Sequence, residues 1–600
     1  MSRKIPERRE LPEALTWDLS PMYADDAAWE RDFALLDGLL EAFLGFRGRL
    51  AESPAVLRGA LEALDELERK LDKLYTFAHL RHDENTAAGP ARARLRNVRS
   101  KAAEISAACA WFEPEVMSIA DDAMRELLNA PELAFYRPSL EELLRAKPHI
   151  LSEVEERLLG DLSDILGASD DIYETLTDAD MRFGKVRDEH GASSELTHGS
   201  YIAFLESRDR TVRRNAFRVM FQGYRNIVNT CAATLDGTVR RHVKKARLRR
   251  YGSALGAALF DDELPEALYT NLIAAVHEAI PVLTDYLKLR SGRLGLKKPD
   301  MYDLFTPLLP MPERRYTFDE ARELVLGAVA VMGDEYVQTV RRAFDERWID
   351  VLECRGKRSG AYSSGCYDSA PYLLLNFQGT LNDVFTLAHE LGHSMHSYFS
   401  RKRQQYHYAD YSIFVAEVAS ITNELLLHHH LMEQCSDPAL RATLLAHQAD
   451  EIRATIFRQT MFAEFELDIH RAVEQGGVLT ADYLNENYYK LNDRYYGGAI
   501  RADRLIQYEW ARIPHFYYDF YVFKYATGMA AALKFARNIR SGDPELLKRY
   551  YGFLGAGDSK PALEIMRDAG VDLARKEVIG DALGDFAAVV RKLGELLHSC

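Results

Sequence analysis

Apolar residues recur at helical spacing along most of the chain and are separated by charged and polar positions. Near the start of the sequence, one apolar stripe runs over residues 36–43 and the next over residues 61–74. Residues three and four apart share one face of a helix, so such stripes are typical of amphipathic helices. The alternation of helix and polar break over residues 29–159 therefore predicts antiparallel helical pairs.

Two segments interrupt this helical texture. Residues 170–201 lose the apolar periodicity and gain Gly, Thr, Ser and Asp, which indicates a domain boundary. We expect an N-terminal helical domain over residues 1–185 and a larger domain over residues 186–600.

A compact apolar run at residues 372–377, in a segment rich in Gly, Ser and Tyr, predicts a strand. The predicted fold class is mainly α with a small β-sheet.

Composition and charge narrow the class of protein. Hydrophobic residues make up 47% and charged residues 28% of the 600 positions, the balance of a globular chain with large cores. The formal net charge of −15 disfavours nucleic acid and anionic membranes, so we expect neither as a partner. The basic run at residues 240–250 is interpreted as a solvated helix face rather than a nucleic-acid site. The sequence makes no prediction of oligomeric state.

A cytoplasmic location is expected. No apolar segment follows the basic start in the way that a signal peptide requires. No run of about 18 apolar residues suits a membrane span. The six cysteines lie far apart without a CxxC pair, which favours a reducing compartment over a disulfide-bonded one.

The strongest chemical signal is an HExxH motif, formed by His389, Glu390 and His393 in the segment LNDVFTLAHELGHSMHSYF. On a helix, positions i and i+4 share a face, so both imidazoles can reach one zinc ion while Glu390 lies beside the first. A helix with two unrelated histidines is the alternative. The apolar stripe around the motif makes this alternative less favourable, because it predicts that the helix is buried. Gly392 leaves room for a neighbouring element to approach the helix closely.

A catalytic zinc site needs a third protein ligand and an open position for water. The extended pattern HExxHxxGxxH, in which a third histidine follows the motif, is absent. His396 stands where this pattern requires a glycine, and Phe399 stands where it requires a histidine. A downstream carboxylate is therefore expected. Glu417 lies among apolar residues, where an unpaired carboxylate is costly. Glu424, two turns further on, either orients a ligand histidine or is an ordinary surface carboxylate.

A second polar feature is the aromatic segment HFYYDFYVFKY. His515, Tyr518, Tyr521 and Tyr525 recur at spacings of three and four, which predicts that they share one helical face. Their N–H and O–H groups can donate hydrogen bonds to a developing oxyanion. An aromatic core stripe with satisfied hydroxyls is the alternative that these residues leave open.

Taken in order, several strings resemble the oligoendopeptidase F family of zinc metallopeptidases, relatives of thimet oligopeptidase. They are GKRSGAY, NFQGTLNDVFTLAHELGHSMHSYFS, FVAEVASITNE and PHFYYDFYVFKYATG, and the opening WDLSPMYADDAAWERDF is also similar to the family's N-terminus. The resemblance implies a large helical two-lobed metallopeptidase, with a small β-sheet beside the HExxH helix and a deep substrate channel. It also implies an endopeptidase for short unfolded oligopeptides. Residues 186–600 would form its zinc metallopeptidase catalytic domain.

The resemblance implies roles for individual residues. One zinc ion per chain would be bound by His389, His393 and Glu417, with Glu390 as general base. His515 would contact substrate and Tyr525 would stabilise the transition state. Residues 356–365 would form an edge strand that pairs with the substrate backbone. The further substrate-binding residues are Tyr518, Tyr521, Gly360 and Tyr362.

Two other functions stay open at this point. A zinc carboxypeptidase or dipeptidyl carboxypeptidase needs a fixed cation to hold the terminal carboxylate of its substrate, and Arg501, Arg504 and Arg512 are candidates. An inactive peptide-binding protein is the remoter alternative, because loss of activity would most simply show as a substituted base or ligand.

Overall fold

The structure is a computed structural model of the chain that describes residues 5–309 and 314–599. Within these ranges the fold is mainly α, with five short strands in two small sheets, which confirms the predicted fold class. No helix of the described ranges combines the length and the apolar character that a membrane span needs. The free thiols of these ranges are Cys109, Cys231, Cys354, Cys366 and Cys435, and Cys600 lies outside them.

The chain divides into two compact units, each assembled from three separate stretches of sequence. The first unit takes its described residues from Met1–Pro148, Arg314–Leu431 and Phe535–Gly570, and the second from His149–Glu313, Met432–Lys534 and Val571–Cys600. Each unit therefore depends on contacts between residues that are distant in sequence. The division of the chain near residue 185 stays a prediction.

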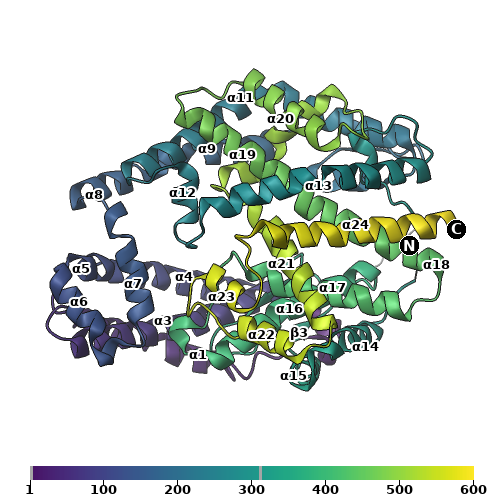
Figure 1. The fold of residues 1–600 in the computed structure, drawn as a ribbon. Helices are drawn as coiled ribbons and strands as arrows, with labels where there is room; N and C mark the ends of the chain where they lie inside the picture. Colours follow the sequence, from purple (N-terminus) through teal and green to yellow (C-terminus); the bar gives the residue numbers. More distant parts are fainter. Residues whose placement is uncertain (1–4, 310–313, 600) are drawn as a thin grey trace. The chain divides into compact units, whose positions relative to one another are not determined.

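The first unit holds the HExxH motif and the larger sheet. Its long N-terminal helices lie side by side, as Figure 1 shows for α3 and α4. Helix α17 begins in this unit, and α21 ends in it. Its helices are α1 (Asp26–Phe33), α2 (Leu36–Leu44), α3 (Pro54–Glu84), α4 (Gly89–Cys109), α5 (Phe112–Ser118), α6 (Asp121–Asn129), α7 (Arg137–Arg145), α14 (Phe318–Ala328), α15 (Asp334–Asp345), α16 (Leu381–Arg403), α17 (Ala416–Gln434), α22 (Pro544–Leu554) and α23 (Ala562–Asp568).

The three-stranded sheet of the first unit packs against the HExxH helix. Strand β5 (Tyr372–Leu374) lies in the centre, parallel to β3 (Ile349–Asp350) and antiparallel to β4 (Tyr362–Ser364). All three residues of β5 are buried, which agrees with the predicted strand at 372–377. Both β4 and β5 contact α16. The small sheet beside the HExxH helix is thus confirmed, and β4 is one of its edges.

The sequence of helix α16 provides an N-terminal cap and an apolar face that can be buried. Thr380 is the N-cap, and its side chain and that of Asp383 bond reciprocally to each other's backbone N–H groups. The apolar stripe predicted around the motif is buried, and Leu387 and Leu391 are completely shielded from solvent. Burial of this face fixes the direction in which the histidines on the other side of the helix point.

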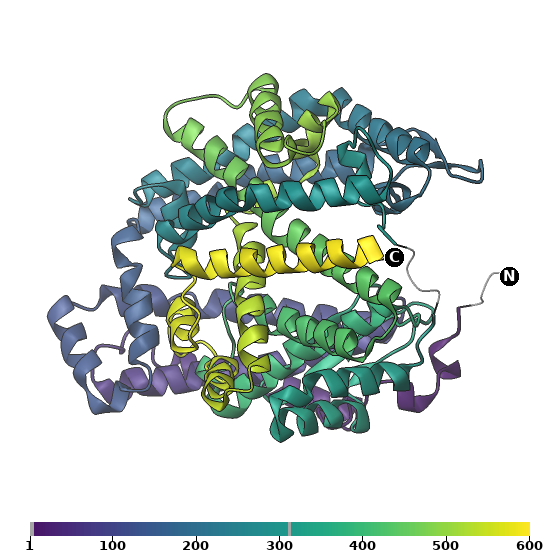
Figure 2. The ribbon, with the colours of Figure 1, turned by 45° about the vertical axis from the view of Figure 1, so that its right-hand side comes forward.

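The second unit is almost entirely helical. Helices α13 and α24 run side by side along their length (Figure 1 and Figure 2). A short hairpin of β1 (Lys185–Arg187) and β2 (Ser193–Glu195) lies in the segment where helical periodicity is lost. The helices are α8 (Glu153–Asp161), α9 (Ser163–Glu174), α10 (His198–Glu206), α11 (Arg210–Leu248), α12 (Ala254–Leu259), α13 (Glu266–Arg293), α18 (Pro438–Ile452), α19 (Gln459–Glu474), α20 (Ala481–Tyr496), the first part of α21 (Phe523–Arg540) and α24 (Lys576–Ser599).

Candidate functional site

Helices α16 and α17 bring the three predicted metal ligands together. The Nε2 atom of His389 lies 3.2 Å from Nε2 of His393 and 3.3 Å from Oε2 of Glu417, and His393 Nε2 lies 3.5 Å from the same oxygen. Zinc binds nitrogen and oxygen at about 2.0–2.2 Å, so two ligand atoms of a tetrahedral ion lie roughly 3.3 Å apart. The donor atoms of this ligand triangle therefore fit a tetrahedral ion, with the fourth position left for water.

Glu424 contacts the first histidine of the motif. Its Oε1 atom lies 2.6 Å from Nδ1 of His389. Because a carboxylate accepts, the Nδ1 atom carries the proton and Nε2 turns its lone pair toward the other ligands. Of the two interpretations of Glu424, this contact favours the orienting role.

Replacing Glu424 by glutamine is expected to weaken metal binding about 10- to 100-fold, the usual cost of losing a partner of a ligand histidine. The amide oxygen of Gln still accepts the Nδ1 proton, but the negative charge that makes the imidazole a stronger donor is gone. Competition titration against a chelator measures the affinity. The control is Glu323→Gln, which removes an exposed carboxylate of the same unit. Equal affinities of Glu424→Gln and the control would contradict the orienting role.

Protons and metal compete for the ligand triangle. Burial disfavours a charged imidazole, but the hydrogen bonds of Glu417 and Glu424 outweigh it and raise the pKa of His389 to about 10. Burial likewise opposes ionisation of Glu417, yet its hydrogen bonds with both histidines lower the pKa of this carboxyl. A metal ion bound at the ligand triangle would compete with protons for these atoms, so its affinity is expected to decrease as the pH falls.

Glu390 lies beside the ligand triangle on the same helix without being part of it. Its side chain is buried, with 7% of its surface exposed. Burial raises the pKa of this carboxyl. The nearby backbone N–H of Ser363, in edge strand β4, acts in the opposite direction and favours the charged carboxylate. The hydroxyl of Ser363 also lies 2.8 Å from that of Ser394 on α16, so the strand and the helix are fixed to each other beside Glu390.

Gly392 allows α17 to approach α16 closely. A Cβ atom at this position would lie 2.5 Å from the Cα of Ser420 and 2.7 Å from the backbone oxygen of Ala419. Both are backbone atoms of α17, so a side chain could not be accommodated without displacing that helix. The predicted close approach of a neighbour at Gly392 is confirmed.

Replacing Gly392 by alanine is expected to destabilise the protein by about 1–3 kcal/mol, the usual cost of overpacking. The shift of α17 also moves Glu417 away from the histidines, so metal content should fall with stability. Thermal unfolding and metal analysis measure the two effects. Gly552→Ala on α22 is the matched control, because its new Cβ would meet no atom within 4 Å. Normal metal content in Gly392→Ala would contradict the packing argument.

The other predicted substrate residues of the first unit lie on and before strand β4. Gly360 has a φ of +87°, in the left-handed region, and its carbonyl accepts a hydrogen bond of 2.8 Å from the Asn376 side chain. The Tyr362 hydroxyl donates to Asp83 on α3 at 3.0 Å. Asp83 was not predicted from the sequence. Its only sequence signal is that an acidic residue follows Leu80 by three positions, on a helix face that is buried. Ser363 was not predicted either, because a residue that acts through its backbone leaves no residue-type signal.

The prediction that the aromatic segment forms one continuous helical face is wrong. A 3₁₀ turn (Pro514–Tyr517) ends before the segment's middle, and α21 begins only at Phe523. Between them Asp519 and Phe520 have φ angles of 51° and 61°, in the left-handed region. The buried carboxylate of Glu466 accepts the Phe520 N–H at 2.7 Å. A distant side chain thus satisfies an N–H group outside any helix, and the Phe520 ring is buried.

This loop nevertheless gathers the four predicted side chains within the second unit. The ring of His515 lies 5.6–6.2 Å, between centroids, from the rings of Tyr518, Tyr521 and Tyr525. Its Nε2 atom lies 3.5 Å from the hydroxyl of Tyr525. Burial lowers the pKa of His515, so the ring is neutral at neutral pH. The cluster offers one imidazole and three phenols as hydrogen-bonding groups, and it is made by a loop instead of a helix.

The sequence is similar to those of known proteins over nearly the whole chain. The sequence profile described as peptidase family M3 matches residues 203–585, and that described as oligopeptidase F matches residues 115–183. Oligopeptidase PepF of Bacillus subtilis is 40% identical over 99% of this chain and 89% of its own. Group B oligopeptidase PepB of Streptococcus agalactiae is 42% identical over 98% of both chains.

Solved structures agree with these matches. A structure from Chlamydophila abortus is 37% identical and superimposes with a TM-score of 0.94 over 99% of this chain and 100% of its own. The oligoendopeptidase-F of Enterococcus faecium is 35% identical, with a TM-score of 0.74 over 96% of this chain and 100% of its own. The similarity in sequence and in fold therefore extends over nearly the full length.

Proposed function

Because the chain belongs to peptidase family M3 and is a metallopeptidase, we propose that it is a zinc-dependent endopeptidase that cleaves internal bonds of short unfolded oligopeptides. The observation that carries this proposal is the ligand triangle of His389, His393 and Glu417, with Glu390 buried beside it. A zinc ion held there would supply a Lewis acid that lowers the pKa of water and polarises a carbonyl group. We also propose a cytoplasmic location, which the five free thiols of the described residues support.

Glu390 has the position and chemistry of a general base. Its carboxylate takes a proton from the attacking water and delivers it to the nitrogen of the leaving amine. The nearby N–H of Ser363 favours the charged form of the carboxylate, which is the form that accepts a proton. Strand β4 is also a sheet edge, and its unpaired backbone groups suit an extended peptide added as a further strand. Gly360 and Tyr362 would line this peptide.

His515 and Tyr525 are proposed to donate hydrogen bonds to the substrate during the reaction. The support is their resemblance to the family's residues and the hydrogen-bonding groups of their own cluster. A neutral imidazole can donate from one nitrogen, and a phenol donates from its hydroxyl. Donors of this kind stabilise charge on a carbonyl oxygen more in the transition state than in the ground state. Tyr518 and Tyr521 are proposed to bind substrate alongside them.

Replacing Tyr525 by phenylalanine is expected to lower kcat about 100- to 1000-fold, as loss of one oxyanion donor does, with metal content unchanged. Steady-state kinetics on an internally quenched peptide, with metal analysis of the same sample, measures both. Tyr489→Phe is the matched control, because the Tyr489 ring stacks under Arg504 and keeps that contact without its hydroxyl. A change confined to KM would assign Tyr525 to ground-state binding instead.

The carboxypeptidase alternative is not favoured. Arg504 forms an ion pair of 2.8 Å with Glu486, and Arg512 lies 3.7 Å from buried Glu509. Two of the three candidate cations thus already neutralise carboxylates of the protein itself. A guanidinium engaged in this way is a poorer anchor for the terminal carboxylate of a substrate.

The proposal is tested by incubating the purified protein with unmodified peptides of graded length and with a folded protein, with and without a chelator. Mass spectrometry then identifies every product. Chelator-sensitive internal cuts in short peptides, with the folded protein intact, are the expected result. Products trimmed only from the C-terminus would instead support the carboxypeptidase alternative. No products from a metal-loaded sample would overturn the peptidase proposal.

A further inference from the structure

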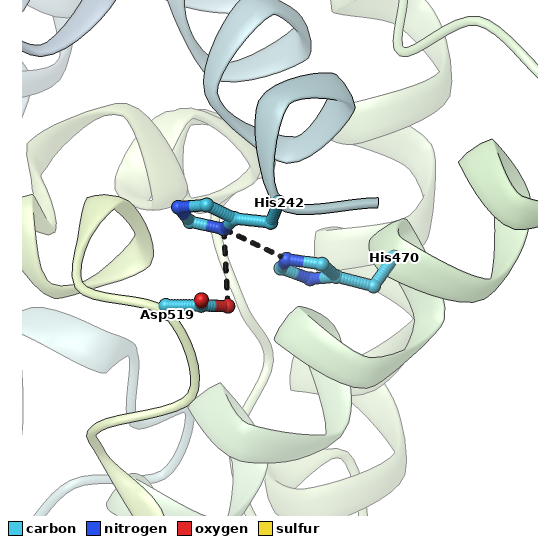
Figure 3. Close-up of side chains that lie close together, drawn as sticks. All are labelled: His242, His470 and Asp519. Carbon is cyan, nitrogen blue, oxygen red and sulfur yellow. Dashed lines mark hydrogen bonds and ion pairs between the residues drawn. The ribbon is translucent and has the colours of Figure 1, made fainter. Parts of the chain in front are cut away.

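A second group of metal-binding side chains lies wholly within the second unit. His242 on α11, His470 on α19 and Asp519 in the loop before α21 converge on one point, as Figure 3 shows. The Nδ1 atom of His242 lies 3.2 Å from Nε2 of His470 and 3.2 Å from Oδ1 of Asp519. These two distances match the 3.2–3.5 Å within the ligand triangle of α16 and α17, and all three ligand atoms lie within 4.8 Å of one another. The cluster therefore has the spacing of a metal site.

His470 is held in the tautomer that a metal ligand needs. Its Nδ1 atom lies 2.8 Å from the backbone oxygen of Glu466, so this nitrogen carries the ring proton and Nε2 presents a lone pair to the cluster. Burial lowers the pKa of His470 to about 4 and also lowers the pKa of His242. Both rings are therefore neutral at neutral pH. A neutral imidazole with an inward lone pair, as at Nε2 of His470, is a usual nitrogen ligand of transition metals.

Asp519 supplies the negative charge of the cluster. Its Oδ1 atom is shielded from solvent, and its contact with Nδ1 of His242 lacks the geometry of a hydrogen bond. Burial raises the pKa of this carboxyl to about 6, so it is still ionised at neutral pH. A shielded carboxylate oxygen that accepts no well-formed hydrogen bond is unfavourable, and a cation at the centre of the cluster would remove that cost.

Two cationic side chains of α11, Arg241 and Lys245, lie close enough to influence the cluster. The Nη2 atom of Arg241 lies 3.3 Å from Nε2 of His242 and 2.7 Å from Oδ2 of Asp170. An ion bound at Nδ1 of His242 places the ring proton on Nε2, so the contact with Arg241 must open. The ion pair with Asp170 holds the guanidinium independently of this contact. Arg241 therefore weakens metal binding without blocking it.

We propose that His242, His470 and Asp519 form a second metal site, which binds one zinc-like divalent transition metal. Two imidazole nitrogens and one carboxylate oxygen favour zinc and its neighbours over calcium and magnesium, which prefer oxygen ligands alone. The ion joins α11 and α19 to the loop at Asp519. Because this loop carries His515 and Tyr521, the site positions the aromatic cluster, a role that rests on the function proposed above.

The test uses the full chain with the ligand triangle disabled by His389→Ala and His393→Ala. Cobalt(II) is titrated into this double variant, since its visible absorption reports tetrahedral nitrogen and oxygen ligands. One bound equivalent is expected, and Asp519→Asn in the same background should weaken it at least tenfold. Asparagine has nearly the shape of aspartate and tolerates a left-handed φ, so the loop conformation is kept. His198→Gln, on a histidine that bonds Tyr224 instead, is the control and should bind cobalt unchanged.

Four outcomes bear directly on the second site. No cobalt bound by the double variant, or cobalt bound equally well after both Asp519→Asn and His470→Gln, would overturn it. Tighter cobalt binding in Arg241→Gln would support it, because the competing donor to His242 is removed. Zinc should also raise the unfolding temperature of the double variant, and Asp519→Asn should abolish that rise. None of these readings uses peptide cleavage, so failure of the second site and failure of the peptidase proposal are distinguishable.

Discussion

Replacing Glu390 by glutamine is expected to lower kcat about 100- to 10,000-fold, the range for loss of a general acid–base group, while the metal content stays unchanged. Glutamine has nearly the same shape, and its amide oxygen can still accept from the nearby N–H of Ser363. It cannot take a proton from water. The variant should therefore keep its fold, its metal and its substrate affinity and lose only the proton transfer.

Turnover of an internally quenched peptide and metal analysis of the same preparation measure the Glu390 variant. Glu335→Gln is the matched control, because Glu335 is an exposed carboxylate of the same unit that pairs with Lys402 on α16. The control should retain both activity and metal. Full activity in Glu390→Gln would reject the proposed mechanism. A parallel loss of metal would show that Glu390 acts on the ligand triangle instead of on water.

Replacing His393 by alanine is expected to remove the metal of the ligand triangle and, with it, all peptide hydrolysis. The remaining donors, His389 and Glu417, leave one corner of the triangle open, and an ion with two protein ligands exchanges readily with solvent. The loss of affinity should exceed the roughly 10- to 100-fold expected for a residue that only orients a ligand. Because the second site would keep its own ion, the expected reading is a loss of one equivalent.

Metal analysis after chelator treatment, beside activity with and without added zinc, measures the His393 variant. His396→Gln on the same helix is the control, since His396 is buried and stacks on Tyr411 with 3.7 Å between ring centroids, away from the triangle. The control should lose some stability and keep its metal. Tight binding of the full metal complement by His393→Ala, with activity intact, would remove His393 from the ligand set.

Much of the candidate metal centre could be predicted from the sequence because it depends on local geometry. The i and i+4 spacing of His389 and His393 places both rings on one face of any helix, and the apolar stripe decides which face is buried. Glu417 could be predicted because an acid in an apolar helical segment needs a partner. The strand at residues 372–374 also followed from local composition. These features need only residue types and helical or strand periodicity.

The tertiary structure decided which distant groups meet. Glu424 had two interpretations, and only the contact of its carboxylate with His389 favours the orienting role. The N–H of Ser363 lies near Glu390 because β4 packs on α16. The sequence pattern predicted a helix at Asp519, whereas buried Glu466 binds the N–H of the next residue and the chain turns into a loop.

The second metal site depends even more on long-range packing. His242 lies in a basic run that was interpreted as a solvated helix face, yet its side chain is buried against His470, which is 228 residues further along the chain. No periodicity links these positions with Asp519. The sequence by itself determined the helices and the proposed ligand set that one helix and its neighbour carry. Only the tertiary structure decided the contacts between remote segments, because these depend on which surfaces the whole chain buries together.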